Sequence, residues 1–249
     1  MIFRQLLEEV SSTYTYLLGC PDTRQAILID AVLPMWERDL GEIRRLGLEL
    51  TYTLETHVHA DHITGARKLR EATGSRIAHP GLDRLTCTDV PLEEGQPLVV
   101  GGLHIEPLHT PGHTDHHFAY RLGDCVFTGD ALLIDGCGRT DFQSGDARAL
   151  YESVTGKLFT MPAETLVYPA HDYQGRWVSS IAQERARNPR LGGGKTLAQF
   201  TDIMAQLHLP YPTFIDHALP GNRQCGVWPP GVPEDLSQYC EQISASRQG

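Results

Sequence analysis

The 249-residue sequence has no Cys-x-x-Cys pair, and it lacks a run of about 18 apolar residues, the length that a membrane-spanning helix needs. It is also short of positive charge, because 31 acidic residues against 21 Lys and Arg give a formal net charge of -10. These absences argue against a membrane protein, a disulfide scaffold and a protein that binds a phosphate backbone. The first residues also lack the basic and then apolar pattern of a secretory signal. We therefore expect a cytoplasmic protein with no nucleic-acid or membrane partner.

Cysteine and histidine are distributed differently along the chain. The six cysteines are scattered without close pairs: Cys20, Cys87, Cys125, Cys137, Cys225 and Cys240. Because a disulfide-rich secreted domain has a much higher cysteine density, we predict that all of them are reduced. Histidines are instead concentrated between His57 and His117. Such bunching suits metal ligation.

Hydrophobic periodicity predicts strands in hairpins with helices interspersed, unlike the strict alternation of a doubly wound sheet. Strands are expected over residues 13–18, 26–30, 48–54, 76–78, 118–122, 125–128 and 165–168, with two more within 97–109. Helices are expected over residues 36–46, 65–72, 146–158, 178–187 and 197–207. A glycine run at 192–194 interrupts the pattern. We predict one domain over residues 1–249, with a short C-terminal extension from about residue 192.

The motif His57-x-His59-x-Asp61-His62 carries four potential metal ligands within six positions. It comes directly after a predicted strand and directly before a predicted helix. A single histidine in such a turn is usually structural, but side chains packed this closely can converge on one cavity. The motif therefore predicts a metal site.

Three later residues follow β-like runs in the same way, namely His113, Asp130 and His171. Gly112 and Gly129 stand beside two of them and allow the backbone to turn sharply and to approach a metal closely. Taken singly, each of the three could be an ordinary turn residue or a cap. Together with the first motif they form a candidate ligand set.

This set of motifs resembles the metallo-β-lactamase superfamily over roughly residues 13–190. Longer strings resemble the persulfide dioxygenases within it, at residues 56–65, 128–134, 136–143, 168–173 and 188–191. The resemblance implies an α/β fold, an αββα sandwich in which two mixed β-sheets are flanked by helices. It also implies an oxidoreductase that oxidises the sulfane sulfur of glutathione persulfide with O₂, giving sulfite and glutathione.

By the same resemblance one Fe(II) per chain is held by His57, His113 and Asp130. Two imidazoles and one carboxylate on one face of iron leave positions open for substrate and O₂. The resemblance implies no catalytic residue beyond the metal site. Four residues surround it and orient ligands or substrate: His59, Asp61, His62 and His171.

The resemblance also suggests substrate contacts and an assembly. Arg190 and Tyr173 match positions near the substrate, and an arginine suits a glutathione carboxylate because its fork binds both oxygens. Arg139 is a third candidate, although an Arg139–Asp141 ion pair could equally hold the loop. A homodimer is expected from the resemblance alone.

Some residues near these motifs receive no role in the reaction. Cys137 and Cys225 match cysteines in the related enzymes, but a buried free cysteine usually behaves as a small hydrophobe. Asp115-His116-His117 departs from the residues that often follow Gly-His-Thr in the family. We expect the two histidines to be solvated or to act as caps.

Two alternatives remain open from the sequence. A thioester hydrolase resembling glyoxalase II uses the same ligands for two metals and a bridging hydroxide. The string after Asp130 and the limited length after His171 favour the oxygenase. The other alternative is a non-catalytic metal-binding protein that has kept the fold, against which the complete ligand set argues. Metal analysis distinguishes one iron per chain from two zinc or mixed metals.

Overall fold

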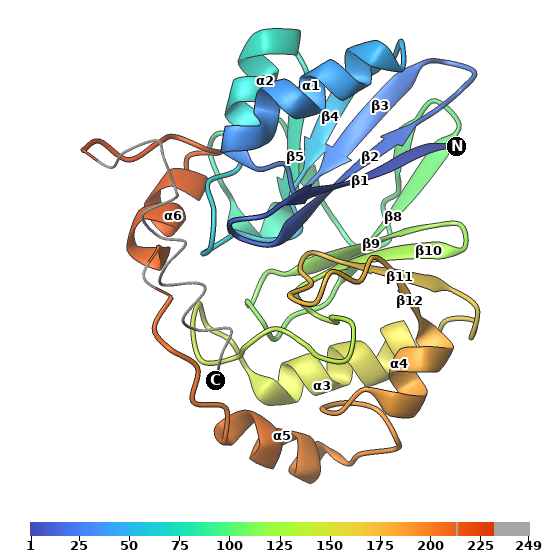
Figure 1. Cartoon of the computed structure of the whole chain (residues 1–249), viewed down its shortest axis with the longest axis vertical. Helices are drawn as coiled ribbons and strands as arrows, with labels where there is room; N and C mark the ends of the chain where they lie inside the picture. The colour runs from blue at the N-terminus through green and yellow to red at the C-terminus, as the bar shows by residue number, and fades with distance from the viewer. Residues whose placement is uncertain (213, 232–249) are drawn as a thin grey trace. The chain divides into compact units, whose positions relative to one another are not determined.

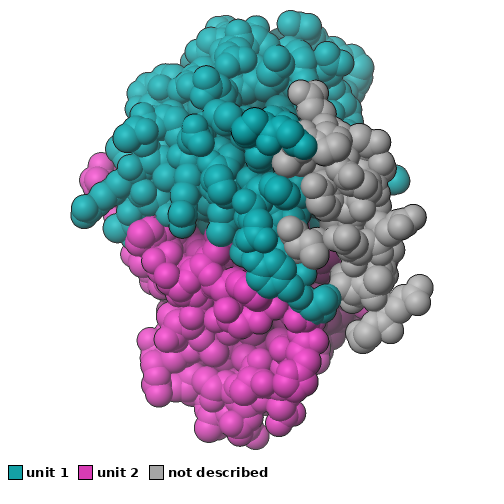
Figure 2. Space-filling model, turned by 90° about the vertical axis from the view of Figure 1, so that its left-hand side faces the viewer, with its two compact units in different colours: residues 1–92, 99–104, 210–249 teal, residues 93–98, 105–209 magenta. Residues whose placement is uncertain are grey.

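The computed structural model describes residues 1–212 and 214–231, and the chain divides into two compact units (Figure 2). Unit 1 contains residues 1–92, 99–104 and the chain from 210 onward, and unit 2 contains residues 93–98 and 105–209. The helix predicted after the glycine run belongs to unit 2, whereas the chain from Pro210 returns to unit 1. One domain over residues 1–249 stays a prediction.

Unit 1 is built on a six-stranded mixed sheet in the order β1-β2-β3-β4-β5-β6 (Figure 1). The first three strands pair antiparallel, and β3 to β6 pair parallel. The strands are β1 (Ile2–Glu8), β2 (Thr13–Gly19), β3 (Gln25–Ile29), β4 (Glu49–Leu54), β5 (Arg76–Pro80) and β6 (Val90–Leu92). The helices are η1 (Leu33–Met35), α1 (Trp36–Arg45), α2 (Ala66–Thr73), η2 (Gly81–Asp83) and α6 (Ile215–Asn222).

Helices α1 and α2 lie side by side over the first sheet (Figure 1). Leu40 and Ile43, three residues apart on α1, share a buried cluster with Leu28 of β3 and Leu69 of α2. The 3.6-residue period of the helix brings these apolar side chains to one face. The loop that carries the His57 motif runs from the end of β4 to the start of α2. Because both elements pack into this cluster, both ends of the loop are fixed.

Unit 2 contains most of a second six-stranded mixed sheet, in the order β12-β11-β10-β9-β8-β7. Strands β8, β9 and β10 pair antiparallel, whereas β10 and β11 pair parallel. The strands are β7 (Leu98–Val100), β8 (Leu103–His109), β9 (Phe118–Leu122), β10 (Cys125–Gly129), β11 (Leu166–Pro169) and β12 (Ser179–Ser180). The helices are α3 (Ala147–Gly156), η3 (Leu158–Thr160), α4 (Ile181–Arg187) and α5 (Leu197–Ala205).

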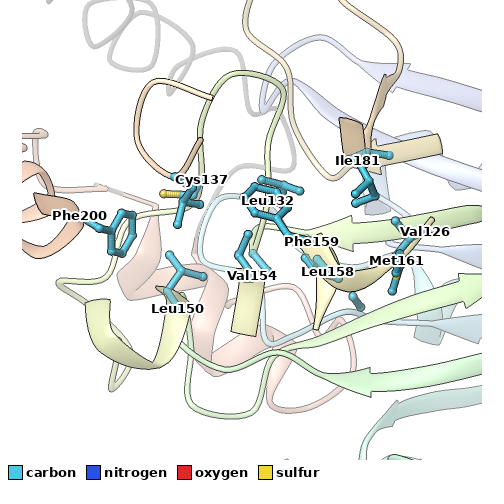
Figure 3. Packing of buried hydrophobic residues seen from close by; sticks show 14 of the residues in the cluster. Val126, Leu132, Cys137, Leu150, Val154, Leu158, Phe159, Met161, Ile181 and Phe200 are labelled. Carbon is cyan, nitrogen blue, oxygen red and sulfur yellow. The ribbon is translucent and has the colours of Figure 1, made fainter. Parts of the chain in front are cut away.

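The core of unit 2 joins its helices to β10 and β11. Val126 of β10 lies in one buried cluster with Val154 of α3, Ile181 of α4 and Phe200 of α5 (Figure 3). The predicted N-cap of α3 is confirmed, because the Asp146 carboxylate accepts a hydrogen bond from the Ala149 amide at 2.7 Å. The cluster anchors the strands whose ends carry Asp130 and His171.

The fold of two mixed sheets flanked by helices is confirmed, and all predicted strands and helices are present within a few residues. The elements that were not predicted are β1, β6, β12, η1, η2 and α6. The strand β1 is partly exposed along nearly its whole length and has no clear alternation. Strand β6 has only three residues. Helix α6 contains Pro220 and lies within a Pro- and Gly-rich stretch, a composition typical of irregular structure.

The prediction that all cysteines are reduced is wrong for Cys87 and Cys225, which form a disulfide across 138 residues of sequence. Their spacing carries no signal, because only the return of the chain to unit 1 brings them together. Cys20, Cys125 and Cys137 are free and buried, and Cys240 lies outside the described residues. In the described part of the chain, no helix is long and apolar enough to cross a membrane.

Candidate metal site

The predicted site residues fall into two groups, one in each unit. His57, His59, Asp61 and His62 lie in unit 1, in the loop between β4 and α2. In unit 2, His113 follows β8, Asp130 follows β10 and His171 follows β11.

A hydrogen-bonded chain of three side chains orients His57, which is buried. Thr56 donates its hydroxyl proton to a carboxylate oxygen of Asp30 at 2.9 Å, and its amide donates to the other oxygen at 2.7 Å. The same hydroxyl lies 2.9 Å from His57 Nδ1. Because its only proton is already given to Asp30, the hydroxyl accepts from Nδ1–H of His57. This leaves the lone pair of the ring on Nε2, the atom available to a metal.

His59 is completely buried between two carboxylates. Its Nε2 lies 3.2 Å from Asp30 and 3.2 Å from Glu55. Burial opposes the charged imidazolium, but these two carboxylates outweigh it and raise the pKa of His59 well above its ordinary value. Thr64 donates to the second oxygen of Glu55 at 2.6 Å, which ties this network to the far end of the loop.

His62 and Asp61 form a second pair in the loop, with His62 Nδ1 at 3.0 Å from the Asp61 carboxylate. The rings of His57 and His59 lie 4.2 Å apart, and those of His59 and His62 lie 4.4 Å apart. Ligand atoms of His59, Asp61 and His62 all lie within 4.8 Å of one another. Among the described residues, His59 Nδ1 and His62 Nε2 are buried without a hydrogen-bond partner. A buried nitrogen without any partner is costly, so His62 Nε2 suits a metal ion. His59 Nδ1 suits one only after the ring gives up the proton that the two carboxylates favour.

In unit 2 the backbone orients His113. Its Nδ1 donates to the carbonyl oxygen of Arg139 at 2.8 Å, so the lone pair of this ring also stands on Nε2. His113 Nε2 lies 3.4 Å from one carboxylate oxygen of Asp130. Gly138 makes this approach possible: a Cβ there would lie 2.5 Å from the Asp130 carbonyl oxygen and 2.8 Å from His113 Nδ1.

Asp130 is held at its backbone by the neighbouring loops. Its amide donates to His117 Nε2 at 3.0 Å, and its carbonyl accepts from the Gly138 amide at 2.7 Å. The second carboxylate oxygen lies 3.5 Å from His171 Nε2 and has no hydrogen bond among the residues that the structure describes. The carboxylate is therefore available to a cation while its backbone is locked.

His117 is completely buried, so the expectation of a solvated residue is wrong for it. Since His117 Nε2 accepts from Asp130, its proton stands on Nδ1, which lies 2.9 Å from the Thr110 hydroxyl. His117 therefore orients Asp130. Its neighbour His116 is partly exposed, with Nε2 3.7 Å from Asp115.

The three predicted substrate residues lie in unit 2. Arg139 binds both carboxylate oxygens of Asp141, at 2.6 and 2.7 Å, which confirms the ion pair. This Arg139 contact lowers the pKa of Asp141. Tyr173 is largely exposed, and its ring stacks on that of His171 at 6.0 Å. Arg190 donates to the Cys137 carbonyl at 2.6 Å and is half-buried.

Three residues that hold the site were missed from the sequence, namely Asp30, Glu55 and Asn222. All three are buried polar side chains, and Asp30 and Asn222 are distant in sequence from the loop that they hold. Cys137 behaves as expected for a small buried hydrophobe, because burial raises the pKa of its thiol to about 11. Among the missed residues, only Asp30 had a signal in the sequence, because it follows a strand, as the proposed ligands do.

The donor atoms fit a divalent metal. His57 and His113 each present an unprotonated Nε2, and Asp130 presents a carboxylate. Imidazole and carboxylate ligands of this kind suit iron, zinc or manganese. His59, Asp61 and His62 form a further potential donor set within unit 1.

Comparison with known proteins agrees with this arrangement. Residues 9–171 match the sequence pattern of the metallo-beta-lactamase superfamily. The chain therefore belongs to the metallo-β-lactamase superfamily, which its two mixed sheets and His/Asp motifs define. Relatives narrow this further. The human protein named persulfide dioxygenase ETHE1, mitochondrial, is 47% identical over 240 residues, which cover 92% of this chain and 91% of the relative.

A solved structure is equally similar. The crystal structure of ETHE1 from Myxococcus xanthus superposes with a TM-score of 0.89 and is 53% identical, covering 91% of this chain and all of that one. A hydroxyacylglutathione hydrolase of Polaromonas is 36% identical over 166 residues, which cover 64% of this chain and 62% of the relative. Within the superfamily, the chain belongs to the persulfide dioxygenase family.

Proposed function

We propose that this protein is a glutathione-dependent persulfide dioxygenase, which oxidises the sulfane sulfur of glutathione persulfide with O₂ to sulfite and glutathione. The observation that supports this most strongly is the 47% identity to a persulfide dioxygenase over 92% of the chain. The similarity to hydroxyacylglutathione hydrolases covers only 64% of the chain. The oxygenase is therefore the better account of the whole sequence.

We further propose that His57, His113 and Asp130 together hold one Fe(II) per chain. Support comes from each half separately. Thr56 keeps the proton of His57 on Nδ1, and the Arg139 carbonyl does the same for His113. Iron held by these residues would supply the activation of O₂. His59, Asp61, His62 and His171 would surround it without binding it.

The remaining residues position the reactants. Arg190 is half-buried, with one guanidinium nitrogen on the Cys137 carbonyl, which leaves the side chain restrained in direction. A restrained guanidinium suits a carboxylate of glutathione, since less entropy is lost on binding. Arg139 is the weaker candidate, because Asp141 already neutralises it. Its backbone carbonyl has the more direct role of orienting His113.

The decisive experiment is anaerobic purification with metal quantification, followed by O₂ uptake with glutathione persulfide. One iron per chain, persulfide-dependent O₂ uptake and sulfite formed in proportion to O₂ are expected. Two metals per chain with thioester cleavage and no O₂ uptake would support the hydrolase instead. Protein that holds iron and does neither reaction would be a non-catalytic metal-binding protein.

The hydrolase keeps one specific observation in its favour. His59, Asp61 and His62 form a potential donor set in unit 1, as a second metal would require. A homodimer in the cytoplasm stays our expectation for the assembly and location. Size-exclusion chromatography with light scattering would test the dimer.

The substrate role of Arg190 predicts a change in KM. Arg190→Ala is expected to raise KM for glutathione persulfide by about 10- to 100-fold, because a charge-assisted hydrogen bond contributes about 1.5–3 kcal/mol. Iron content should stay at the wild-type level. Steady-state O₂ uptake measures KM and kcat. Arg148→Ala, on the exposed face of α3, is the control. Unchanged KM would remove the role of Arg190.

A further inference from the structure

Asn222, the last residue of α6, is bound to the loop that carries His57, His59 and His62. Its side-chain nitrogen donates to the carbonyl oxygens of His59 at 2.8 Å and of His62 at 2.7 Å. Its side-chain oxygen accepts from the Thr64 amide at 2.9 Å. Asn222 is buried, so one amide group satisfies three backbone groups of the loop that are remote from water.

The chain after Asn222 continues to enclose the same loop. The carbonyl of Cys225 accepts from the Arg67 amide in the first turn of α2, at 3.1 Å. Gly226 has φ of +97°, and a Cβ there would lie 2.2 Å from the Thr64 carbonyl oxygen. The backbone therefore passes too close to the loop for any side chain at this position.

The disulfide joins this segment to the sheet of unit 1. Cys225, three residues after Asn222, is bonded to Cys87 in the connection between η2 and β6. The pair shares a buried cluster with Ile77 of β5 and Ala66 of α2. The first turn of α2 and the end of α6 are thus next to a covalent bond that the reaction itself does not use.

We propose that Asn222 is a positioning residue for the metal-binding loop, and that the Cys87–Cys225 disulfide holds it there, so that reduction by a thiol loosens the loop and lowers metal affinity. The inference rests on the proposed function only in that His57 of this loop binds the metal. In the cytoplasmic location that we expect, disulfides are mostly redox-sensing or transient, which would agree with a regulatory bond.

The chemistry is thiol–disulfide exchange. A small thiolate attacks Sγ of Cys87, the more exposed of the two sulfurs, and forms a mixed disulfide while Cys225 leaves as a thiolate and takes up a proton. A second thiol attacks the mixed disulfide and releases Cys87. The products are two protein thiols and one small-molecule disulfide, so the two electrons come from two thiols. Glutathione, the thiol that the proposed reaction releases, belongs to this chemical class.

The first test measures Fe(II) affinity anaerobically, by competition with a chromogenic chelator. Asn222→Asp keeps the shape and an oxygen for Thr64 but offers no N–H to the two carbonyls. We expect it to weaken Fe(II) binding by about 10–100-fold, as is typical for the loss of an orienting partner. Ile43→Ala, in the α1 core of the same unit, is the control for general destabilisation and should keep wild-type affinity.

The second test follows hydrogen exchange at the Thr64 amide in metal-free protein. Asn222→Ala removes its acceptor and should speed exchange, whereas Asn222→Asp keeps an acceptor and should leave exchange slow. A purely structural role would give the same ranking of variants in stability, exchange and metal affinity. A positioning role is specifically indicated if Asn222→Asp weakens Fe(II) binding but keeps slow exchange at the Thr64 amide, whereas Asn222→Ala speeds that exchange.

The third test compares wild type and Cys87→Ser before and after treatment with a dithiol that is then removed. Reduced wild type should bind Fe(II) several-fold more weakly and exchange Thr64 faster, and reoxidation should reverse both. Cys87→Ser should resemble reduced wild type and not respond to the dithiol, which also controls for metal taken up by the reagent.

Three results would overturn the proposal: wild-type Fe(II) affinity in Asn222→Asp, an equal loss in Ile43→Ala, or unchanged affinity after mass spectrometry has verified reduction. Failure of wild type to bind Fe(II) at all would overturn it as well. If instead Fe(II) binds and responds as expected but O₂ uptake with persulfide is absent, the proposed function fails and the positioning role stands.

Discussion

The loop of unit 1 that carries His57 is held mainly by side chains, whereas the loops of unit 2 that carry His113 and Asp130 are held largely through the backbone. Asp30 and Asn222 reach the first loop from other elements of unit 1. In unit 2 the Arg139 carbonyl orients His113, and Gly138 allows the close approach. The site residues of unit 1 should therefore be sensitive to substitution of buried polar residues, and those of unit 2 to substitutions that take up space beside the backbone.

The difference has a physical reason. Four potential ligands crowd into six positions in unit 1, so their backbone is irregular and has few partners of its own; buried carboxylate and amide groups supply them. In unit 2 each ligand stands alone at the end of a strand. Strands β8, β10 and β11 run in the same direction in one sheet, with β9 between β8 and β10, so their ends lie at one edge, and tight turns complete the arrangement.

The largest effect should follow the loss of a proposed ligand from either half. His57→Ala and Asp130→Ala are each expected to lose nearly all iron and persulfide-dependent O₂ uptake, beyond the about 10–100-fold cost of losing an orienting partner. Elemental analysis and an oxygen electrode measure the two quantities. His116→Ala, in the loop beside His113, is the control and should keep its iron. A full iron content in Asp130→Ala would contradict the ligand assignment.

A smaller effect is expected from the side-chain network of unit 1. Asp30→Asn weakens the acceptor of Thr56 and His59, so Fe(II) affinity should fall by about 10–100-fold. The free energy of unfolding should fall by about 1–3 kcal/mol, because buried polar groups lose a charged partner. Chelator competition and urea unfolding measure these changes.

The matched control for Asp30→Asn is Asp89→Asn. Asp89 accepts from the Ile77 amide at 2.8 Å in the same unit but does not touch the His57 loop. It should lose stability and keep Fe(II) affinity. Equal losses of affinity in both variants would mean that unit 1 as a whole, and not its network, sets the site.

The backbone-held half is tested by Gly138→Ala, with Gly136→Ala as its control. A methyl group at 138 meets Asp130 and His113 at 2.5 and 2.8 Å, whereas at 136 the nearest atoms are 3.8 and 4.0 Å away. Overpacking of this kind costs about 1–3 kcal/mol, and here it displaces two proposed ligands. The thermal unfolding temperature and the iron content should both decrease for Gly138→Ala and stay unchanged for Gly136→Ala. Similar behaviour of the two variants would show that Gly138 is not needed for the close approach.

The smallest effect on the site is expected for Asp39, which lies in α1 and contributes only to stability. Burial, partly offset by Arg38, raises its pKa from 3.8 to about 6. The native protein therefore binds more protons than the unfolded chain between these values, so stability falls as pH rises from about 4 to about 6. The total is about 3 kcal/mol, at 1.36 kcal/mol per pKa unit.

Asp39→Asn should remove this pH dependence and leave Fe(II) affinity unchanged. Urea unfolding of both proteins at several pH values between 4.5 and 7.5 gives the comparison. A difference in stability between them that stays constant with pH would show that Asp39 titrates at its ordinary value.

Prediction from sequence succeeded where the pattern is local. Periodicity located α1 and the strands that lead to each ligand, and the spacing of the His57 motif identified a metal site. It failed for α6, because Pro220 and the surrounding glycines favour irregular structure when tertiary packing is not considered. It also missed His117, which looks like one of two adjacent surface histidines until the fold buries it against Asp130.

What the sequence by itself determined is the set of ligand-type residues, their positions at strand ends and the superfamily, because these follow from residue type and spacing. Only the tertiary structure decided which nitrogen of His57 and His113 carries the proton, since Asp30 and the Arg139 carbonyl come from distant segments. It also decided the Cys87–Cys225 bond and the place of Asn222. Hydrogen bonds and disulfides join atoms that are near in space, and sequence spacing carries no record of that nearness.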